Sequence, residues 1–137
     1  ILGGAFDQLP RELRICFAHG GGSFAFLLGR LENAWLHRDV ARGRSLQPPS
    51  AYLDRFHVDS AVFDPAALRF LVGCMGLERV MLGSDYPFPL GEAVPGETIE
   101  ALTELAPAAR ERMLVGTALE FLGRPVRPAG PAPVAAG

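Results

Sequence analysis

Apolar residues follow two different spacings along this chain, and the two spacings alternate. Short apolar runs bounded by polar residues or glycine are typical of strands buried in a parallel sheet, and they cover residues 14–18 and 79–84, while the alternating, β-rich residues 56–63 predict a further strand. Elsewhere the apolar residues recur every three to four positions, which predicts helices over residues 23–35, 65–76, 96–106 and 107–123. Strands separated by helix-length crossovers predict an α/β fold with a parallel sheet.

Turn-forming and capping residues mark where these elements begin and end. Asp64 followed by Pro65 is a helix-start signal, with an N-cap and a proline in the first position. Residues 39–50 contain glycine and two prolines and predict a loop. The Pro/Ala/Gly-rich residues 124–137 predict a disordered tail after a folded segment over residues 1–123. An open doubly wound sheet and a (β/α)8 barrel both fit this order, and in both, function gathers at the carboxyl ends of the strands.

Composition narrows the class of protein without identifying its chemistry. Of the 137 residues, 49% are hydrophobic and 20% are charged, and the net charge of −2 comes without the basic stripe of a nucleic-acid-binding protein. No apolar stretch approaches the roughly 20 residues of a membrane span. Cys16 and Cys74 lack metal-type spacing, so we expect buried free thiols in a reducing cytoplasm. The chain begins at Ile1, and we expect it to be part of a longer protein.

A histidine and an aspartate each follow a predicted strand. His19 comes directly after residues 14–18 and precedes three glycines, and Asp85 comes directly after residues 79–84. An imidazole at a strand end is either held by a backbone carbonyl, or serves as a metal ligand or general acid/base. A carboxylate there either caps a turn or binds a metal. Because parallel strands end at the same edge of a sheet, the two side chains are candidates for one site.

Other polar residues and motifs are weaker candidates. The HGGG sequence also forms the oxyanion hole of some esterases, but no GxSxG nucleophile motif follows, which excludes that interpretation. We expect His37 to face solvent and His57 to open the second strand at the opposite end from the site. Arg30 is either a surface cation or a clamp for a substrate carboxylate. For Asp59 and Phe88 we expect structural roles.

Three stretches, "CFAHGGGSFAFLLGRLENAW", "PPSAYLDRFHVDSAVFDPAALRFLV" and "ERVMLGSDYPFPLGE", together resemble a known family. They are similar to the C-terminal half of the 2-amino-3-carboxymuconate-6-semialdehyde decarboxylases, which are zinc-dependent members of the amidohydrolase superfamily. The resemblance covers roughly residues 1–123 and implies the C-terminal part of a distorted (β/α)8 barrel. It also implies non-oxidative decarboxylation of a small-molecule carboxylate, in tryptophan (kynurenine) or nitrobenzoate breakdown, by a homodimer.

The resemblance implies roles for four residues. The family's AHGGG histidine, here His19, is the acid/base that activates a zinc-bound water, and its SDYPFP aspartate, here Asp85, is a zinc ligand. The arginine of the GR dipeptide, here Arg30, binds a substrate carboxylate in the neighbouring subunit's site. Phe88 packs near the substrate.

The chain also departs from the family pattern. The family's HxH zinc motif and a further zinc histidine do not occur in it, and Thr117 stands where the family usually has asparagine. We therefore expect the remaining Zn²⁺ ligands upstream, and no activity from this segment alone. A related decarboxylase of aromatic acids, a metal-dependent hydrolase such as a lactonase, and a noncatalytic fragment or interaction module are the alternatives.

Overall fold

Three short parallel strands form the centre of the fold. The computed structural model describes residues 1–125 and contains β1 (Cys16–Phe17), β2 (His57–Asp59) and β3 (Val80–Met81) in the order β1-β2-β3. Phe17 pairs with Val58, and Val58 pairs with Val80, so β2 lies in the middle of the sheet. The predicted parallel α/β fold is confirmed. The strands are shorter than predicted, because the residues that follow each of them turn away from the sheet.

Two helical crossovers join the strands. The first contains η1 (His19–Gly21), α2 (Phe24–His37), α3 (Asp39–Arg42) and η2 (Pro49–Arg55). The second contains α4 (Pro65–Met75) and η3 (Leu77–Arg79). The prediction of a loop over residues 39–50 was wrong for α3, where the Arg42 guanidinium stacks 4.8 Å from the Trp35 ring and holds this helical turn against α2. A further turn, α1 (Ala5–Gln8), precedes β1.

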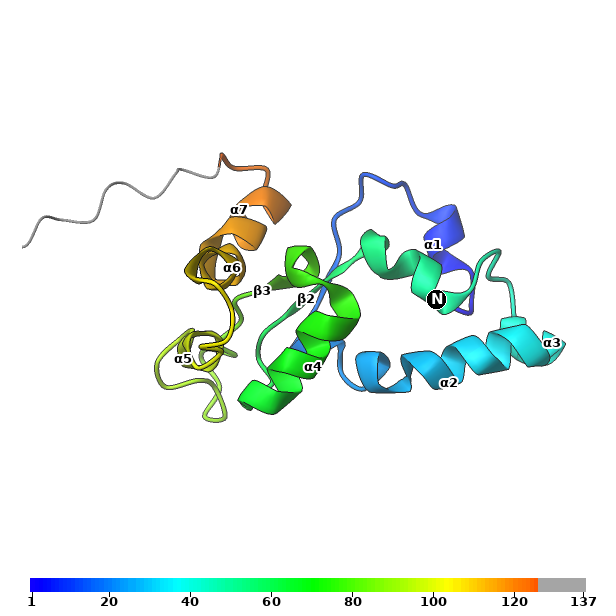
Figure 1. Cartoon of the computed structure of the whole chain (residues 1–137). Helices are drawn as coiled ribbons and strands as arrows, with labels where there is room; N and C mark the ends of the chain where they lie inside the picture. Colours follow the sequence, from blue (N-terminus) through cyan, green and yellow to red (C-terminus); the bar gives the residue numbers. More distant parts are fainter. Residues whose placement is uncertain (126–137) are drawn as a thin grey trace, which may run out of the picture.

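The C-terminal helices pack beside β3 (Figure 1). They are α5 (Glu97–Glu100), α6 (Pro107–Glu111), the π-helical turn η4 (Arg112–Gly116) and α7 (Thr117–Phe121). The helix predicted over residues 107–123 is present as one helical run with a π turn in its middle. The length predicted for the helix over residues 96–106 was wrong, because within this range only α5, Glu97–Glu100, is an α-helix. Leu82 N–H donates to the Met113 carbonyl at 2.9 Å, which ties η4 to the end of β3.

The core lies between the sheet and the helices. Helix α4 begins as predicted, since the Asp64 carboxylate accepts a hydrogen bond from Ala67 N–H at 2.8 Å. Its apolar residues then recur at helical spacing and bury one face of the helix. Side chains with no exposed surface come from α4, β2, β3 and the C-terminal segment: Leu68, Val58, Val80, Ile99, Leu102 and Met113.

Of the predicted tail over residues 124–137, all but Arg124 and Pro125 lies outside the described residues. Within residues 1–125, no helix is long and apolar enough to cross a membrane. Cys16 and Cys74 are free thiols, as predicted, but each is only half-buried.

Candidate functional site

The segments that follow the three strands meet at one edge of the sheet. His19 lies two residues after β1, Asp59 is the last residue of β2, and Asp85 lies four residues after β3. Because the strands are parallel and adjacent, all three positions lie at the carboxyl end of the sheet. The structure therefore brings the His19 and Asp85 segments to the same edge, on either side of β2.

Asp59 connects these segments. Its Oδ1 accepts hydrogen bonds from Gly20 N–H at 2.9 Å and from Ala61 N–H at 3.1 Å. On its other side Gly83 approaches so closely that a Cβ there would lie 2.6 Å from the Asp59 Cβ. Gly83 N–H also donates to the Ser60 hydroxyl at 3.2 Å. One half-buried carboxylate thus contacts the segments that carry His19 and Asp85.

His19 occupies an uncommon backbone conformation. Its φ is 57°, in the left-handed region that few non-glycine residues adopt. The three glycines that follow also have positive φ, so the chain turns sharply between β1 and α2. The imidazole is exposed and makes no hydrogen bond to any side chain or backbone group within residues 1–125. Its ring nitrogens are therefore accessible from solvent.

Asp85 belongs to a closed loop between β3 and α5. Its φ is also left-handed, at 58°, and its carbonyl accepts from Phe88 N–H at 2.9 Å, which closes a tight turn. Glu92 N–H donates to the Ser84 carbonyl at 2.8 Å and closes the loop at its base. The Phe88 side chain is 65% exposed. The loop thus presents the Asp85 carboxylate and the Phe88 ring without burying the ring.

Glu92 anchors this loop to α5. Its carboxylate accepts hydrogen bonds from Gly96 N–H at 2.6 Å, Thr98 N–H at 2.8 Å and the Thr98 hydroxyl at 2.6 Å. Burial alone would raise the pKa of Glu92, but these hydrogen bonds stabilise the carboxylate and leave its pKa lowered overall. The ionised side chain therefore fixes the end of the Asp85 loop.

The structure does not bring Arg30 to the carboxyl edge. Arg30 lies on the exposed surface of α2, six residues after the helix begins, or about 9 Å along its axis. Within residues 1–125 it forms no ion pair. His37 is exposed at the end of α2, as predicted. His57 is the first residue of β2, as predicted. Burial lowers the pKa of its imidazole, and the positive charge of Arg79 lowers it further.

The described residues do not make a complete metal centre by themselves. Residues 1–125 contain no group of three or more His, Cys, Asp and Glu side chains placed to hold a metal ion. Structural and catalytic zinc sites use three or four protein ligands. Asp85 and His19 fit a metal as one or two donors, so a metal centre at this edge needs donors from outside these residues.

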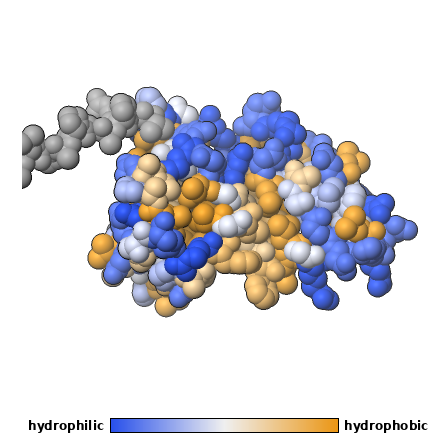
Figure 2. Space-filling model, viewed as in Figure 1, coloured by the Kyte–Doolittle hydropathy of each residue, from blue (hydrophilic) through white to orange (hydrophobic). Residues whose placement is uncertain are grey.

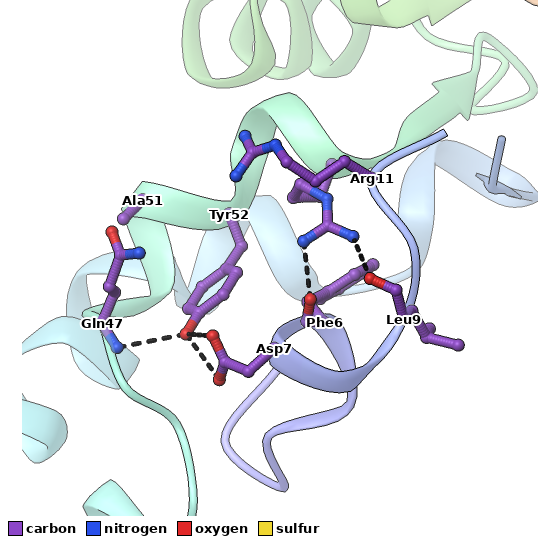
Figure 3. Close-up of a pocket in the computed structure, with 8 residues that line it drawn as sticks. Phe6, Asp7, Leu9, Arg11, Gln47, Ala51 and Tyr52 are labelled. Carbon is purple, nitrogen blue, oxygen red and sulfur yellow. Dashed lines mark hydrogen bonds between the residues drawn. The ribbon is translucent and has the colours of Figure 1, made fainter. Parts of the chain in front are cut away.

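A pocket of about 260 Å³ lies beside α1, away from this edge (Figure 3). Its polar groups satisfy one another: the Tyr52 hydroxyl donates to the Asp7 carboxylate at 2.7 Å. The Arg55 guanidinium donates to the Phe6 carbonyl at 2.6 Å and to the Leu9 carbonyl at 3.0 Å. Tyr52 and Arg55 come from η2, before β2 begins, so this network clamps α1 to η2 rather than facing His19 and Asp85.

Sequence reasoning identified His19 and Asp85 but gave too little weight to two residues that support them. The position of Asp59 at a strand end could have indicated a role at the site. Its contacts with Gly20 and Gly83 could not be predicted, because they join segments that are distant in sequence. Glu92 had no signal beyond its place in the loop sequence, since its partners Gly96 and Thr98 only become apparent once α5 is located.

Comparisons with known proteins show which family the chain resembles. The model of the amidohydrolase family matches residues 1–124. A curated relative from Dictyostelium discoideum, named 2-amino-3-carboxymuconate-6-semialdehyde decarboxylase, is 51% identical over 124 residues, which are 90% of this chain and 34% of the relative. The chain therefore spans about a third of the length of that relative.

Solved structures of decarboxylases share the fold. The 5-carboxyvanillate decarboxylase from Sphingomonas paucimobilis aligns with a TM-score of 0.73 and 28% identity over 90% of this chain and 37% of its own. A dihydroxybenzoic acid decarboxylase from Polaromonas sp. JS666, with bound manganese and the inhibitor 2-nitroresorcinol, aligns with a TM-score of 0.72 and 21% identity over 89% of this chain and 37% of its own. At that identity, the second likeness concerns the fold alone.

Proposed function

The chain belongs to the amidohydrolase family, and we propose that it forms the C-terminal part of a metal-dependent carboxy-lyase. Its sheet is then the last part of a (β/α)8 barrel whose other strands lie outside residues 1–125. The observation that carries this proposal is the meeting of the His19 and Asp85 segments around Asp59 at the carboxyl edge, where barrel enzymes hold their active sites. The 51% identity to a decarboxylase supports the type of reaction.

We assign His19 the transfer of the proton. Non-oxidative decarboxylation breaks the bond between a carbon and its carboxylate, releases carbon dioxide and leaves the bonding electron pair on that carbon. A proton must then be added to the same carbon, and no oxidant or reductant is consumed. His19 suits this step because its imidazole is exposed and has no hydrogen-bond partner among the described residues, and an imidazole is a common general acid.

Asp85 would be this chain's ligand to a divalent metal, with Zn²⁺ as our proposed ion. A bound metal supplies Lewis-acid stabilisation of negative charge on a substrate or water oxygen. Asp85 suits the ligand role because its carboxylate is half-buried, stands in a closed loop and has no hydrogen-bond donor among residues 1–125. Phe88, on the same turn, would contact the apolar part of the substrate.

The substrate that we propose is 2-amino-3-carboxymuconate-6-semialdehyde, which suits tryptophan or nitrobenzoate breakdown in the cytoplasm. The name of the Dictyostelium relative and the three quoted sequence stretches support this choice. A decarboxylase of aromatic acids is the second candidate, favoured by the likeness to 5-carboxyvanillate decarboxylase. Both substrates are small carboxylates, so the reaction type is common to the two.

We also propose that the enzyme is a homodimer in which Arg30 binds the substrate carboxylate of the neighbouring protomer. An apolar surface runs over α4 and the adjoining start of α2 (Figure 2). Phe26 on α2 is 80% exposed, and its ring centroid lies 6.4 Å from that of Phe70 on α4. Arg30 follows one helical turn after Phe26, at the same exposed face. Mixing Arg30→Ala with His19→Ala protomers should then restore activity, because one site of each mixed dimer keeps both residues.

The test of the function is a chimeric enzyme in which residues 1–124 replace the matching segment of the Dictyostelium relative. We expect the metal-loaded chimera to decarboxylate the semialdehyde, followed by its absorbance and by release of carbon dioxide. 5-Carboxyvanillate and a lactone serve as alternative substrates, and the His19→Ala chimera is the inactive control. A folded, metal-loaded chimera that decarboxylates neither acid would overturn the proposal, and lactone hydrolysis instead would assign the site to a hydrolase.

A further inference from the structure

One side chain at the carboxyl edge contacts both segments to which the proposed function assigns chemistry. Asp59 Oδ1 lies 2.9 Å from the Gly20 nitrogen and 3.1 Å from the Ala61 nitrogen, and accepts from both. Asp59 Oδ2 lies on the other side, where a Cβ on Gly83 would be 2.9 Å from it. We propose that Asp59 is a positioning residue, which holds the His19 and Asp85 segments in the arrangement that proton transfer requires.

The hydrogen bond to Gly20 acts directly on the backbone of His19. The Gly20 N–H belongs to the peptide unit that joins His19 to Gly20, so fixing this group fixes the rotation of the peptide that follows the His19 Cα. His19 has a φ of 57°, a conformation that persists in a non-glycine residue only where its surroundings support it. A charged acceptor supplies such support because its hydrogen bonds are shorter and stronger than neutral ones.

The contact with Gly83 acts on the other segment. Gly83 lies two residues before Asp85, and Asp59 Cβ and Cγ would lie 2.6 and 2.8 Å from a Cβ at that position. Glycine is therefore required there for the chain to pass Asp59 this closely. The Ser60 hydroxyl also accepts a hydrogen bond from Gly83 N–H at 3.2 Å. The position of the segment entering the Asp85 loop is thus set by the end of β2.

This inference rests on the proposed function, and its kinetic test uses the chimeric enzyme. In Asp59→Ala the Gly20 N–H loses its acceptor, and we expect kcat to fall at least about tenfold while KM stays within about twofold, because a misplaced acid slows the reaction more than it weakens binding. Asp59→Asn keeps an Oδ1 acceptor in the same place and should retain kcat within about threefold.

A matched control separates positioning from stability. Asp64 is also an aspartate that accepts one backbone hydrogen bond, at the start of α4, but it does not contact the His19 or Asp85 segments. Asp64→Ala should lower the unfolding midpoint without changing kcat. Because part of the effect of Asp59 acts through His19, Asp59→Ala should reduce the residual rate less in a His19→Ala background than in the unsubstituted enzyme. Three results would overturn the inference. The first is an equal loss of rate from Asp59→Ala with and without His19→Ala. The others are an unchanged kcat in Asp59→Ala and an Asp59→Asn variant as slow as Asp59→Ala.

A second measurement does not depend on decarboxylation. Deuterium exchange followed by mass spectrometry should show faster exchange in Asp59→Ala for peptides covering residues 18–22 and 83–85, with no such change in Asp64→Ala. If the unsubstituted chimera lacks decarboxylase activity, the proposed function fails while this measurement still decides whether Asp59 holds the two segments. Unchanged exchange in both peptides would show that it does not.

Discussion

Gly20, the second residue of the HGGG sequence, is expected to be far less tolerant of a methyl group than the other glycines of its region. Its φ is +62°, and a Cβ added to it would lie 2.6 Å from Val62 Cγ1 and 3.1 Å from Leu71 Cδ2. The left-handed backbone costs an L-residue about 1–2 kcal/mol. Forcing a methyl group into packed side chains adds about 1–3 kcal/mol. Gly20→Ala should therefore lower the free energy of unfolding by about 2–5 kcal/mol.

Two other glycines separate these contributions. Gly22 has a φ of +64° and a ψ of −134°, a region that side-chain-bearing residues seldom adopt, but no atom lies within 4 Å of an added Cβ. Gly22→Ala should therefore cost only a backbone contribution of about 1–3 kcal/mol. Gly29 lies inside α2 with nothing within 4 Å of an added Cβ, and Gly29→Ala should stabilise the protein by up to about 1 kcal/mol through helix propensity.

Urea unfolding of the chimeric enzyme, followed by tryptophan fluorescence and circular dichroism, measures the three variants. The midpoints should fall in the order Gly29→Ala, unsubstituted enzyme, Gly22→Ala, Gly20→Ala, with unchanged denaturant slopes. A cost below about 2 kcal/mol for Gly20→Ala would refute the packing argument, because the left-handed backbone alone accounts for about 1–2 kcal/mol. A Gly22→Ala variant as stable as the unsubstituted enzyme would refute the backbone argument.

Four further predictions concern chemistry. His19→Ala should keep its metal and lose turnover, whereas Asp85→Ala should lose both, as measured by elemental analysis and activity of the purified variants; loss of metal from the first would make His19 a ligand. Arg30→Ala should raise KM at least about tenfold, because the substrate carboxylate loses its charged partner. Arg30→Lys should recover little, because an ammonium group cannot pair with a carboxylate in a bidentate manner. Unchanged kinetics in Arg30→Ala would show that Arg30 is only a surface cation. Burial, and then the nearby Asp59, raise the pKa of the Cys16 thiol from 9.0 to about 11. The neutral thiol therefore favours the folded state fully below pH 9, and this contribution is lost as pH rises from 9 through 11. Because the thiolate is the reactive form, the rate of Cys16 alkylation in the folded protein should keep rising with pH up to about 11, and a rate that levels off near pH 9 would contradict the shift. Residues 1–137 expressed alone should bind Zn²⁺ weakly and show no decarboxylation, and turnover near that of an intact relative would contradict this.

Local signals predicted the parts of the fold that local interactions determine. The Asp64 and Pro65 pair predicted the start of α4 because the capping hydrogen bond reaches only to Ala67. Strand lengths were overestimated because apolar residues past each strand, such as Ala61, are buried without sheet pairing. Helix α5 ends early for a similar reason, since Leu102 and Leu105 point into the core from turns rather than from a helix.

The same limit applies to the site. Strand-end position singled out His19 and Asp85 as candidates, and their roles stay a prediction. It was not sufficient to show what holds them, because Asp59 reaches Gly20 across 39 residues of sequence and no periodicity records such a contact. Whether Arg30 has a partner was equally beyond local reasoning, since an exposed cation on α2 has the same sequence pattern whether it meets solvent or a second subunit.

The left-handed conformations of His19 and Asp85 place stability and function in opposition. At φ values of 57° and 58° the backbone favours glycine at both positions, so each side chain is retained against a conformational penalty. Selection for thermal stability alone would drift toward glycine at these two positions and remove both side chains to which we assign chemistry. A stability-guided redesign of this protein would therefore need to hold both positions fixed, because the substitutions that relax the backbone here are the ones that we expect to abolish the proposed reaction.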